Sequence, residues 1–484
     1  MHSSISDLER QPSALKFLFL TEMWERFAYF AVQSILVLFM SKALGLSDNH
    51  AYLIFSAFGA LLFVMPLVGG YLADNFLGYT HAIILGMVFL SIGYFLLAAA
   101  NLKLLPCALA ILILGNGFFK PNISALLGSM YESGAKNREA GFMIFYLGIN
   151  VGATMGVILC GFLAKSFGWS FAIATAATGL LVGGTMFLFS RKRILNDACI
   201  TANSKKLISS TLLTKSWVYV LIIPTLVALW LLMQYVALVS LIVLICATLL
   251  IFYLSIVWFK CSKTERNKFS VCLVLVIFSI AFWALYQQSF MSVMLYLERL
   301  VNLKIFGIVI PPSVVSSFNG IFLIVLAPCT IKFWAFLRRK NKEPNVIIKF
   351  VLGILLMGIG YLIIAFDTNL VSATKLAPLS PIVFSYAIQT LGELLLSPVG
   401  LAMITVLSPQ KIRGLMMGVW FFALAAATTL AGQLAKLTEN AANLAKPMAA
   451  IVYGHAFVTY GGLAVIIALL LFFSSKRLER LIAE

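Results

Sequence analysis

The segment TEMWERFAYFAVQSILVLFM, residues 21–40, is apolar enough to cross a bilayer, yet its first third carries three ionised residues. These are Glu22, Glu25 and Arg26. On insertion scales a charged side chain at membrane depth costs at least about 2.5 kcal/mol. Such residues are expected to face the interior of a helical bundle and to have a function there.

The composition of the whole chain predicts a polytopic membrane protein. Of its 484 residues, 62% are hydrophobic and only 11% are charged, and the mean hydropathy is +1.02. Soluble domains usually contain about 25% charged residues. The seven cysteines form no CxxC pair and the four histidines are scattered, so we predict no metal site and no cofactor. We also expect no cleaved signal peptide, because the first apolar segment contains charges.

The hydropathy pattern predicts fourteen membrane-spanning helices, each about 20 residues or longer. The predicted spans are 14–41, 50–73, 80–100, 104–130, 138–164, 169–190, 216–235, 238–259, 269–298, 311–336, 346–366, 379–408, 413–436 and 449–474. The longest polar segment, 191–215, separates two sets of six spans. We therefore predict an N-terminal bundle (1–190), an inner loop with two additional helices (191–268) and a C-terminal bundle (269–484).

The distribution of Lys and Arg predicts the orientation of these spans. With the N-terminus in the cytoplasm, the inner segments hold 25 of the 35 basic residues and the outer segments hold 8. This asymmetry follows the positive-inside rule. The net charge of +18 is therefore interpreted as a topology signal, and no nucleic-acid partner is predicted. We predict a multi-pass protein of the cell (inner) membrane with both termini in the cytoplasm.

The polar residues of the first span form one stripe along a helix. Their spacing of i, i+3, i+4, i+7 and i+11 places them on the same face. The stripe consists of Glu22, Glu25, Arg26, Tyr29 and Gln33. A static Glu22–Arg26 ion pair would satisfy two of the charges. Two acids and one base leave one carboxylate over, and a spare carboxylate in an apolar cavity suits proton binding.

Other spans carry complementary groups at membrane depth. Lys120 lies in the middle of the fourth span, and Pro121 after it predicts a kink that favours bending. Glu393 lies among leucines in the twelfth span and needs a proton or a partner, for which Lys120 is the candidate. Buried amides and aromatic rings complete the set, although each one alone is also consistent with helix packing. The candidates are Asn150, Gln287, Asn319, Tyr29, Phe63 and Trp420.

Several motifs resemble those of the proton-dependent oligopeptide transporter family within the major facilitator superfamily. EMWERFAYF (22–30) resembles the ExxERFxYY motif, and GNGFFKPNISALLG (115–128) resembles the second family signature. GGYLADNFLG (69–78) and GELLLSPVGL (392–401) resemble two further motifs in the same order. The resemblance covers about residues 14 to 474. It implies an all-α major facilitator fold of two six-helix bundles, with two extra central helices as in bacterial members.

The resemblance also implies a function and residue roles. It implies proton symport of di- and tripeptides by alternating access, with Glu22, Glu25 and Glu393 in proton coupling. By the same resemblance Arg26 and Lys120 would bind the peptide carboxylate. The peptide amino group would meet Asn150, Asn319 and Glu393. The family's usual outer-gate arginine and its partner carboxylate are replaced here by Gln33 and Gln287, and a pocket tyrosine is replaced by Phe63.

Three alternatives differ from proton-driven peptide uptake. An atypical family member with weak or altered proton coupling would move another small zwitterion, such as an amino acid or a peptide-like metabolite. A transport-dead receptor would bind substrate without accumulating it. An enzyme is disfavoured, because the sequence contains neither GxSxG nor HExxH. The expected partners are the peptide, protons and the lipid bilayer, and the expected state is a monomer.

Overall fold

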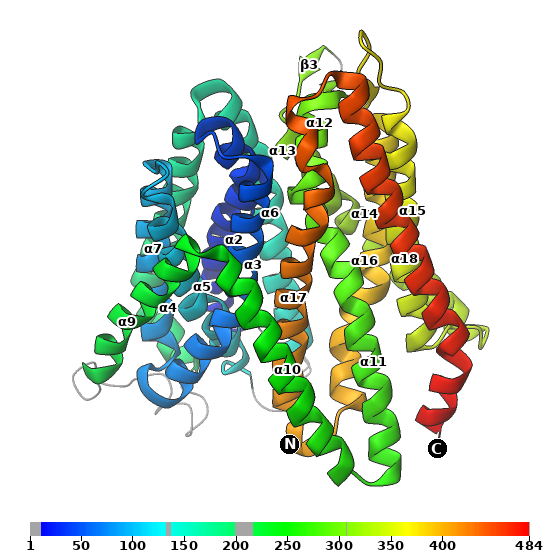
Figure 1. The fold of residues 1–484 in the computed structure, drawn as a ribbon. Coiled ribbons are helices and arrows are strands. Elements are labelled where there is room, and N and C mark those ends of the chain that lie inside the picture. Colours follow the sequence, from blue (N-terminus) through cyan, green and yellow to red (C-terminus); the bar gives the residue numbers. More distant parts are fainter. Residues whose placement is uncertain (1–10, 132–136, 199–215, 306, 484) are drawn as a thin grey trace. The chain divides into compact units, whose positions relative to one another are not determined.

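Long helices make up almost all of the computed structural model, which describes residues 11–131, 137–198, 216–305 and 307–483 (Figure 1). The first half contains α2 (Leu15–Leu38), α3 (Asp48–Leu72), α4 (Tyr79–Ala98), α5 (Leu105–Gly128), α6 (Arg138–Phe167), α7 (Trp169–Ala198) and α9 (Ser216–Gln234). The remainder contains α10 (Val236–Lys260), α11 (Lys263–Tyr286), α12 (Ser292–Leu300), α13 (Pro312–Val315), α14 (Ser317–Arg339), α15 (Val346–Thr368), α16 (Ser380–Leu407), α17 (Arg413–Ala435) and α18 (Lys446–Ala483). Most of the predicted polar segment 191–215 lies outside the described residues.

The helices confirm the predicted all-α polytopic fold. Among the described residues, thirteen helices are long and apolar enough to cross a membrane, and Tyr219–Gln234 is a shorter apolar helix. This shorter helix occupies the position of the predicted span 216–235. Nearly all predicted limits agree with the helices to within a few residues, because apolar runs of this length leave little choice of secondary structure.

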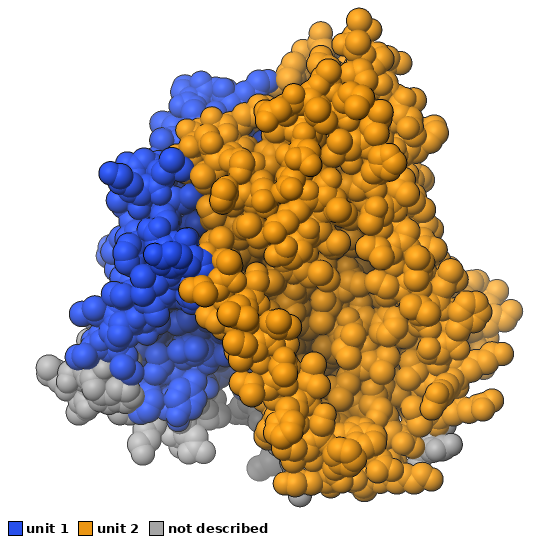
Figure 2. Space-filling view, viewed as in Figure 1, with its two compact units in different colours: residues 1–39, 64–235 blue, residues 40–63, 236–484 orange. Residues whose placement is uncertain are grey.

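The chain forms two compact units, and one boundary between them falls within a helix (Figure 2). One unit contains residues 1–39 and 64–235, and the other contains residues 40–63 and 236–484. The boundary at residues 63 and 64 falls inside α3, three residues before Pro66. A proline inside a helix removes one backbone hydrogen bond and weakens the helix locally. The functional division predicted at residues 190 and 268 stays a prediction.

The predicted span 269–298 is not one continuous helix. It consists of α11 and α12, joined by a short 3-10 segment at Gln287–Phe290. Beyond α12, β1 (Val301–Asn302) pairs in parallel with β4 (Ala377–Pro378), and β2 (Lys304–Ile305) pairs antiparallel with β3 (Ile308–Val309). Gln287 and Gln288 are polar, but two amides in an apolar run also occur in continuous membrane helices, so the hydropathy pattern did not predict the break. The strands are two residues long, which is too short for a recognisable alternation.

A glycine stripe on α6 fixes the position of α2. Gly148, Gly152 and Gly156 follow one another at every fourth residue and lie against the backbone of α2. A Cβ atom at Gly152 would overlap the carbonyl of Met23, and one at Gly156 would overlap the carbonyl of Phe27. Small residues at such spacing let two membrane helices approach closely. The stripe therefore holds the helix that carries Glu22, Glu25 and Arg26.

We predict that Gly152→Ala destabilises the protein, because the new methyl group has only backbone atoms to displace. Overpacking of this kind costs about 1–3 kcal/mol. Thermal unfolding of the detergent-solubilised protein measures the effect. Gly462→Ala is the matched control, since a Cβ atom at Gly462 in α18 meets nothing within 4 Å. Equal unfolding temperatures for the two variants would contradict the close approach of α2 and α6.

Candidate functional site

Four charged side chains from α2 and α5 form a buried ionic cluster. Glu22 and Glu25 are fully buried and Arg26 is 5% exposed. The Arg26 Nε–H donates to Glu25 Oε2 and lies 3.4 Å from Glu22 Oε1. From α5, the Lys120 ammonium donates to Glu22 Oε1 at 3.0 Å. Two acids and two bases thus neutralise one another, as buried charges require.

This arrangement corrects one part of the sequence interpretation. We expected one carboxylate of the stripe to be left over and Lys120 to pair with Glu393. Within the first unit Lys120 pairs with Glu22, because contact between α2 and α5 brings this carboxylate to the lysine, and the stripe thereby gains a second base. The pair of Lys120 with Glu393 stays a prediction. The stripe considered alone could not show the second base, which lies 98 residues further along the chain.

Several polar atoms of the ionic cluster make no hydrogen bond within the described part of the chain. Glu22 Oε2, Glu25 Oε1 and Arg26 Nη2 are buried and have no hydrogen-bond partner within the described part of the chain. The Lys120 side chain is 34% exposed. The Arg26 guanidinium lies over the Tyr29 ring at 4.7 Å. A ligand carboxylate would find both a guanidinium N–H and an ammonium here, the donors that carboxylates prefer.

The predicted gating residues of the first unit are half-buried. Pro121 lies inside α5, one residue from Lys120. A Cβ atom at Gly70 of α3 would stand 3.5 Å from the Pro121 ring, so α3 and α5 touch at this point. Gln33 is half-buried on α2, and its Oε1 has no partner within residues 11–131, 137–198, 216–305 and 307–483.

A second polar group lies in the other unit, between α14 and α16. Asn319 Nδ2 donates to Glu393 Oε2 at 2.9 Å and to Thr390 Oγ1 at 3.1 Å. The Tyr286 hydroxyl donates to Asn319 Oδ1 at 3.3 Å. Glu393 and Asn319 are both half-buried. The amide thus positions a carboxylate that keeps acceptor capacity for a ligand ammonium group.

The remaining candidates differ in their contacts. Asn150 donates to the Tyr146 carbonyl of its own helix at 2.9 Å. Gln287 lies in the 3-10 segment and donates to Thr428 Oγ1 of α17 at 3.3 Å. Trp420 is buried, with its ring against Gly400. Phe63, at the end of the α3 segment that belongs to the second unit, is half-buried.

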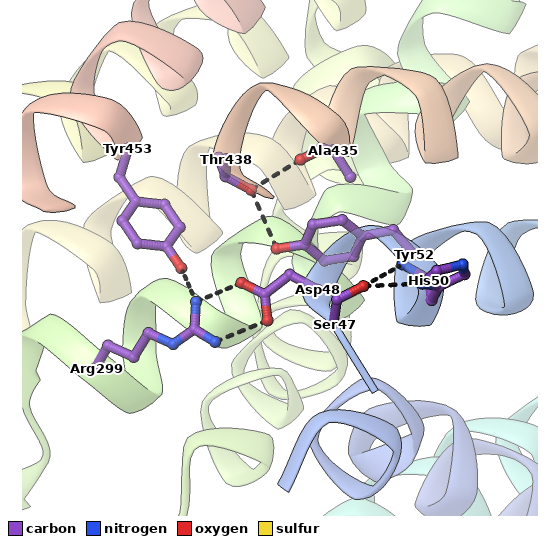
Figure 3. Close-up of polar contacts among 8 residues, drawn as sticks. All are labelled: Ser47, Asp48, His50, Tyr52, Arg299, Ala435, Thr438 and Tyr453. Atoms are coloured by element: carbon purple, nitrogen blue, oxygen red, sulfur yellow. Dashed lines mark hydrogen bonds and ion pairs between the residues drawn. The ribbon is translucent and has the colours of Figure 1, made fainter. Parts of the chain in front are cut away.

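A buried ion pair that was not predicted from the sequence joins the start of α3 and the end of α12 (Figure 3). Arg299 donates to both oxygens of Asp48, at 2.6 and 2.8 Å, and to the Tyr453 hydroxyl at 3.0 Å. The Asp48 side chain is 3% exposed and that of Arg299 is 19% exposed. Nearby, the fully buried Tyr52 hydroxyl lies 3.1 Å from Thr438 Oγ1. The sequence did contain a signal for this pair, since Asp48 and Arg299 carry opposite charges and both lie at predicted outer ends of spans.

These features define a multi-pass helical membrane protein with ionisable groups buried inside its helical bundle. The sequence matches the POT family over residues 80–452, and the chain belongs to this family. It is 30% identical over 476 residues to dipeptide and tripeptide permease A of Klebsiella pneumoniae (strain 342), covering 98% of this chain and 93% of the relative. Dipeptide and tripeptide permease B of Salmonella typhimurium is 32% identical over 91% of this chain and 90% of its own length.

Solved structures agree with this assignment. A crystal structure of a peptide transporter POT variant in complex with alafosfalin is similar with a TM-score of 0.84 and 31% identity, covering 98% of this chain and 97% of that chain. A POT family transporter in complex with 5-aminolevulinic acid is similar with a TM-score of 0.82 and 26% identity, over 97% of both chains.

We predict that Asp48→Asn destabilises the protein by about 3–5 kcal/mol, because it leaves the Arg299 guanidinium buried without its countercharge. The double variant Asp48→Asn/Arg299→Gln is expected to lose clearly less than the two single variants added together. Unfolding of the solubilised protein by heat and denaturant measures all three.

The Lys42–Glu298 pair provides the control for this cycle. Its side chains are 45% and 31% exposed and their charged atoms lie 3.2 Å apart. Exposed pairs contribute about 0–1 kcal/mol. An Asp48–Arg299 coupling as small as that of Lys42–Glu298 would show that burial adds nothing to the pair.

Proposed function

We propose that this protein takes up di- and tripeptides by proton symport through alternating access. The ionic cluster of Glu22, Glu25, Arg26 and Lys120 is the observation that carries this proposal. Its buried, unpartnered Arg26 Nη2 and its partly exposed Lys120 suit a peptide carboxylate. The names of the relatives, dipeptide and tripeptide permeases, support the substrate class.

Charge balance gives a physical reason for coupling the peptide to a proton. The cluster is neutral, with two carboxylates and two cations. A peptide carboxylate that binds Lys120 competes with Glu22 and adds one negative charge in a poorly solvated place, which is costly. One proton on Glu22 or Glu25 restores neutrality, and a proton on Glu22 also releases Lys120 from its partner. Peptide and proton therefore favour each other's binding, as linkage requires.

We propose that the amino end of the peptide binds Glu393 and Asn319. Their hydrogen bond orients the carboxylate, and Glu393 Oε1 is available to accept from an ammonium group. Asn150, Tyr29 and Trp420 are proposed as further contacts with the peptide. All di- and tripeptides share these two charged ends, whatever their side chains.

The two glutamines at the family's usual gate positions limit how the protein couples transport to protons. Gln287 makes a neutral hydrogen bond with Thr428 and brings no titratable group. We therefore propose that coupling rests on Glu22, Glu25 and Glu393.

A second candidate function is transport of another small zwitterion with altered coupling. One structural relative is in complex with 5-aminolevulinic acid, so a family member with this fold binds a ligand that is not a peptide. We propose that the chain is a transporter and not an enzyme or a transport-dead receptor. The basic residues and the bacterial relatives support an inner-membrane location with cytoplasmic termini. The proposed state is a monomer.

Uptake of radiolabelled dialanine into proteoliposomes with an inward proton gradient tests the function. We expect gradient-dependent accumulation that other dipeptides compete and free alanine does not. Equilibration without accumulation would indicate an uncoupled facilitator. Binding without any uptake would favour a receptor, and competition by free alanine would favour the amino-acid alternative.

Glu25→Gln tests the proton role of the cluster. We expect gradient-driven accumulation to fall at least about tenfold, because the variant cannot take up and release a proton at this position. Exchange of labelled for unlabelled peptide, which needs no net proton movement, is expected to persist. Glu479→Gln, an exposed residue near the end of α18, is the control. Unchanged accumulation in Glu25→Gln would remove this residue from the coupling scheme.

A further inference from the structure

An apolar groove lies between α10, α11 and α17 in the second unit. Its volume is about 540 Å³, and Leu254, Trp258, Val276, Ile280, Val419 and Ala423 are among its lining residues. Ser255 is the one hydroxyl residue of the lining, and it donates to the Ile251 carbonyl of its own helix at 2.8 Å. The groove therefore offers an elongated apolar surface with almost no hydrogen-bonding capacity.

The length of the groove matches one leaflet of a bilayer. On α10 it extends from Ala247 to Phe259, which at about 1.5 Å per residue is about 18 Å. Half of a hydrocarbon core about 30 Å thick is about 15 Å. Helix α10 itself is only thinly attached, since Val239, Val243 and Leu254 are its buried residues. An acyl chain lying along α10 would fill the space beside it.

One end of the groove is basic. The Arg266 guanidinium lies 4.9 Å from the centre of the Trp258 ring, which lines the groove. The Trp258 Nε1–H donates to Ser270 Oγ at 2.7 Å, which fixes the ring and so the place of the arginine. Lys260 and Lys263 are exposed at the turn that joins α10 to α11. The lower ends of α10 and α11 meet at this turn in Figure 1.

The described part of the chain supplies no carboxylate partner to these cations. Within the described residues, no ion pair joins Lys260, Lys263 or Arg266 to a carboxylate. The acid of this turn, Glu265, accepts from the backbone and the hydroxyl of Ser262 in a capping box. Elsewhere in the unit the basic residues Arg338 and Lys349 both pair with Glu343. At this end of the groove, cations without an ion-pair partner among the described residues therefore lie next to an apolar surface.

We propose that this groove binds an anionic phospholipid of the surrounding bilayer. One acyl chain lies along α10 between α11 and α17, and the phosphate faces Lys260, Lys263 and Arg266. Tryptophan at the boundary between chain and headgroup is typical of membrane interfaces. Basic residues next to a membrane helix attract anionic lipids. The proposed topology places this end at the cytoplasmic leaflet, and the site is separate from the proposed peptide-binding residues.

Native mass spectrometry of the purified full chain tests the proposal. The protein is incubated with phosphatidylglycerol or with phosphatidylcholine of identical acyl chains, and the bound fraction is compared. We expect a preference for phosphatidylglycerol that falls about tenfold in Lys263→Gln/Arg266→Gln. Lys260→Gln/Lys263→Gln, which changes two exposed residues and leaves the Arg266–Trp258 contact intact, is expected to fall in the same direction.

Two further variants distinguish lipid binding in this groove from a general attraction of anionic lipids to the basic protein. Lys340→Gln/Lys342→Gln removes the same charge from an exposed turn after α14 and is expected to keep the preference. Ala247→Phe fills part of the groove without changing charge and is expected to lower retention of both lipids. Equal retention of the two lipids, an equal loss in the Lys340 variant, or unchanged retention in Ala247→Phe would overturn the proposal. A lipid-free dimer that Ala247→Phe dissociates would assign the groove to a second copy of the chain instead.

Discussion

The mutual neutralisation of Glu22, Glu25, Arg26 and Lys120 is the constraint on which the first unit depends. None of these groups can remain ionised at membrane depth without the others. This requirement holds α5 against α2. The glycine stripe of α6 in turn allows the backbones of α6 and α2 to come into close contact. In the proposed function the same four groups bind the substrate, because a neutral cluster with unpartnered donor and acceptor atoms can exchange one partner for a ligand.

The sequence predicted the helices well and their polar contacts only in part. Apolar runs determine where a span lies, and the spacing of Glu22, Glu25 and Arg26 correctly placed them on one buried face. The Lys120–Glu22 pair was not predicted, because a one-dimensional pattern shows which groups need a partner and does not show which helices touch. The 3-10 break at Gln287–Phe290 was missed because two polar amides inside an apolar run are equally consistent with a continuous helix that hydrogen-bonds to its neighbours.

The Asp48–Arg299 pair illustrates what composition alone hides. Each residue, considered separately, resembles an ordinary charge at a helix end, and 251 positions separate them. Folding buries both and adds the Tyr453 hydroxyl to the guanidinium. The contact joins two stretches of the second unit, residues 40–63 and the helices after residue 236, which are far apart in the sequence.

The glycine stripe of α6 has a mechanical consequence. Carbonyl groups of Phe19, Met23 and Phe27 lie where side chains would otherwise separate the two helices, so α2 cannot turn about its own axis without colliding with α6. The helix therefore carries its charges as part of a single rigid piece. When α2 moves, α6 must move with it, so Glu22, Glu25 and Arg26 keep their orientation relative to α6.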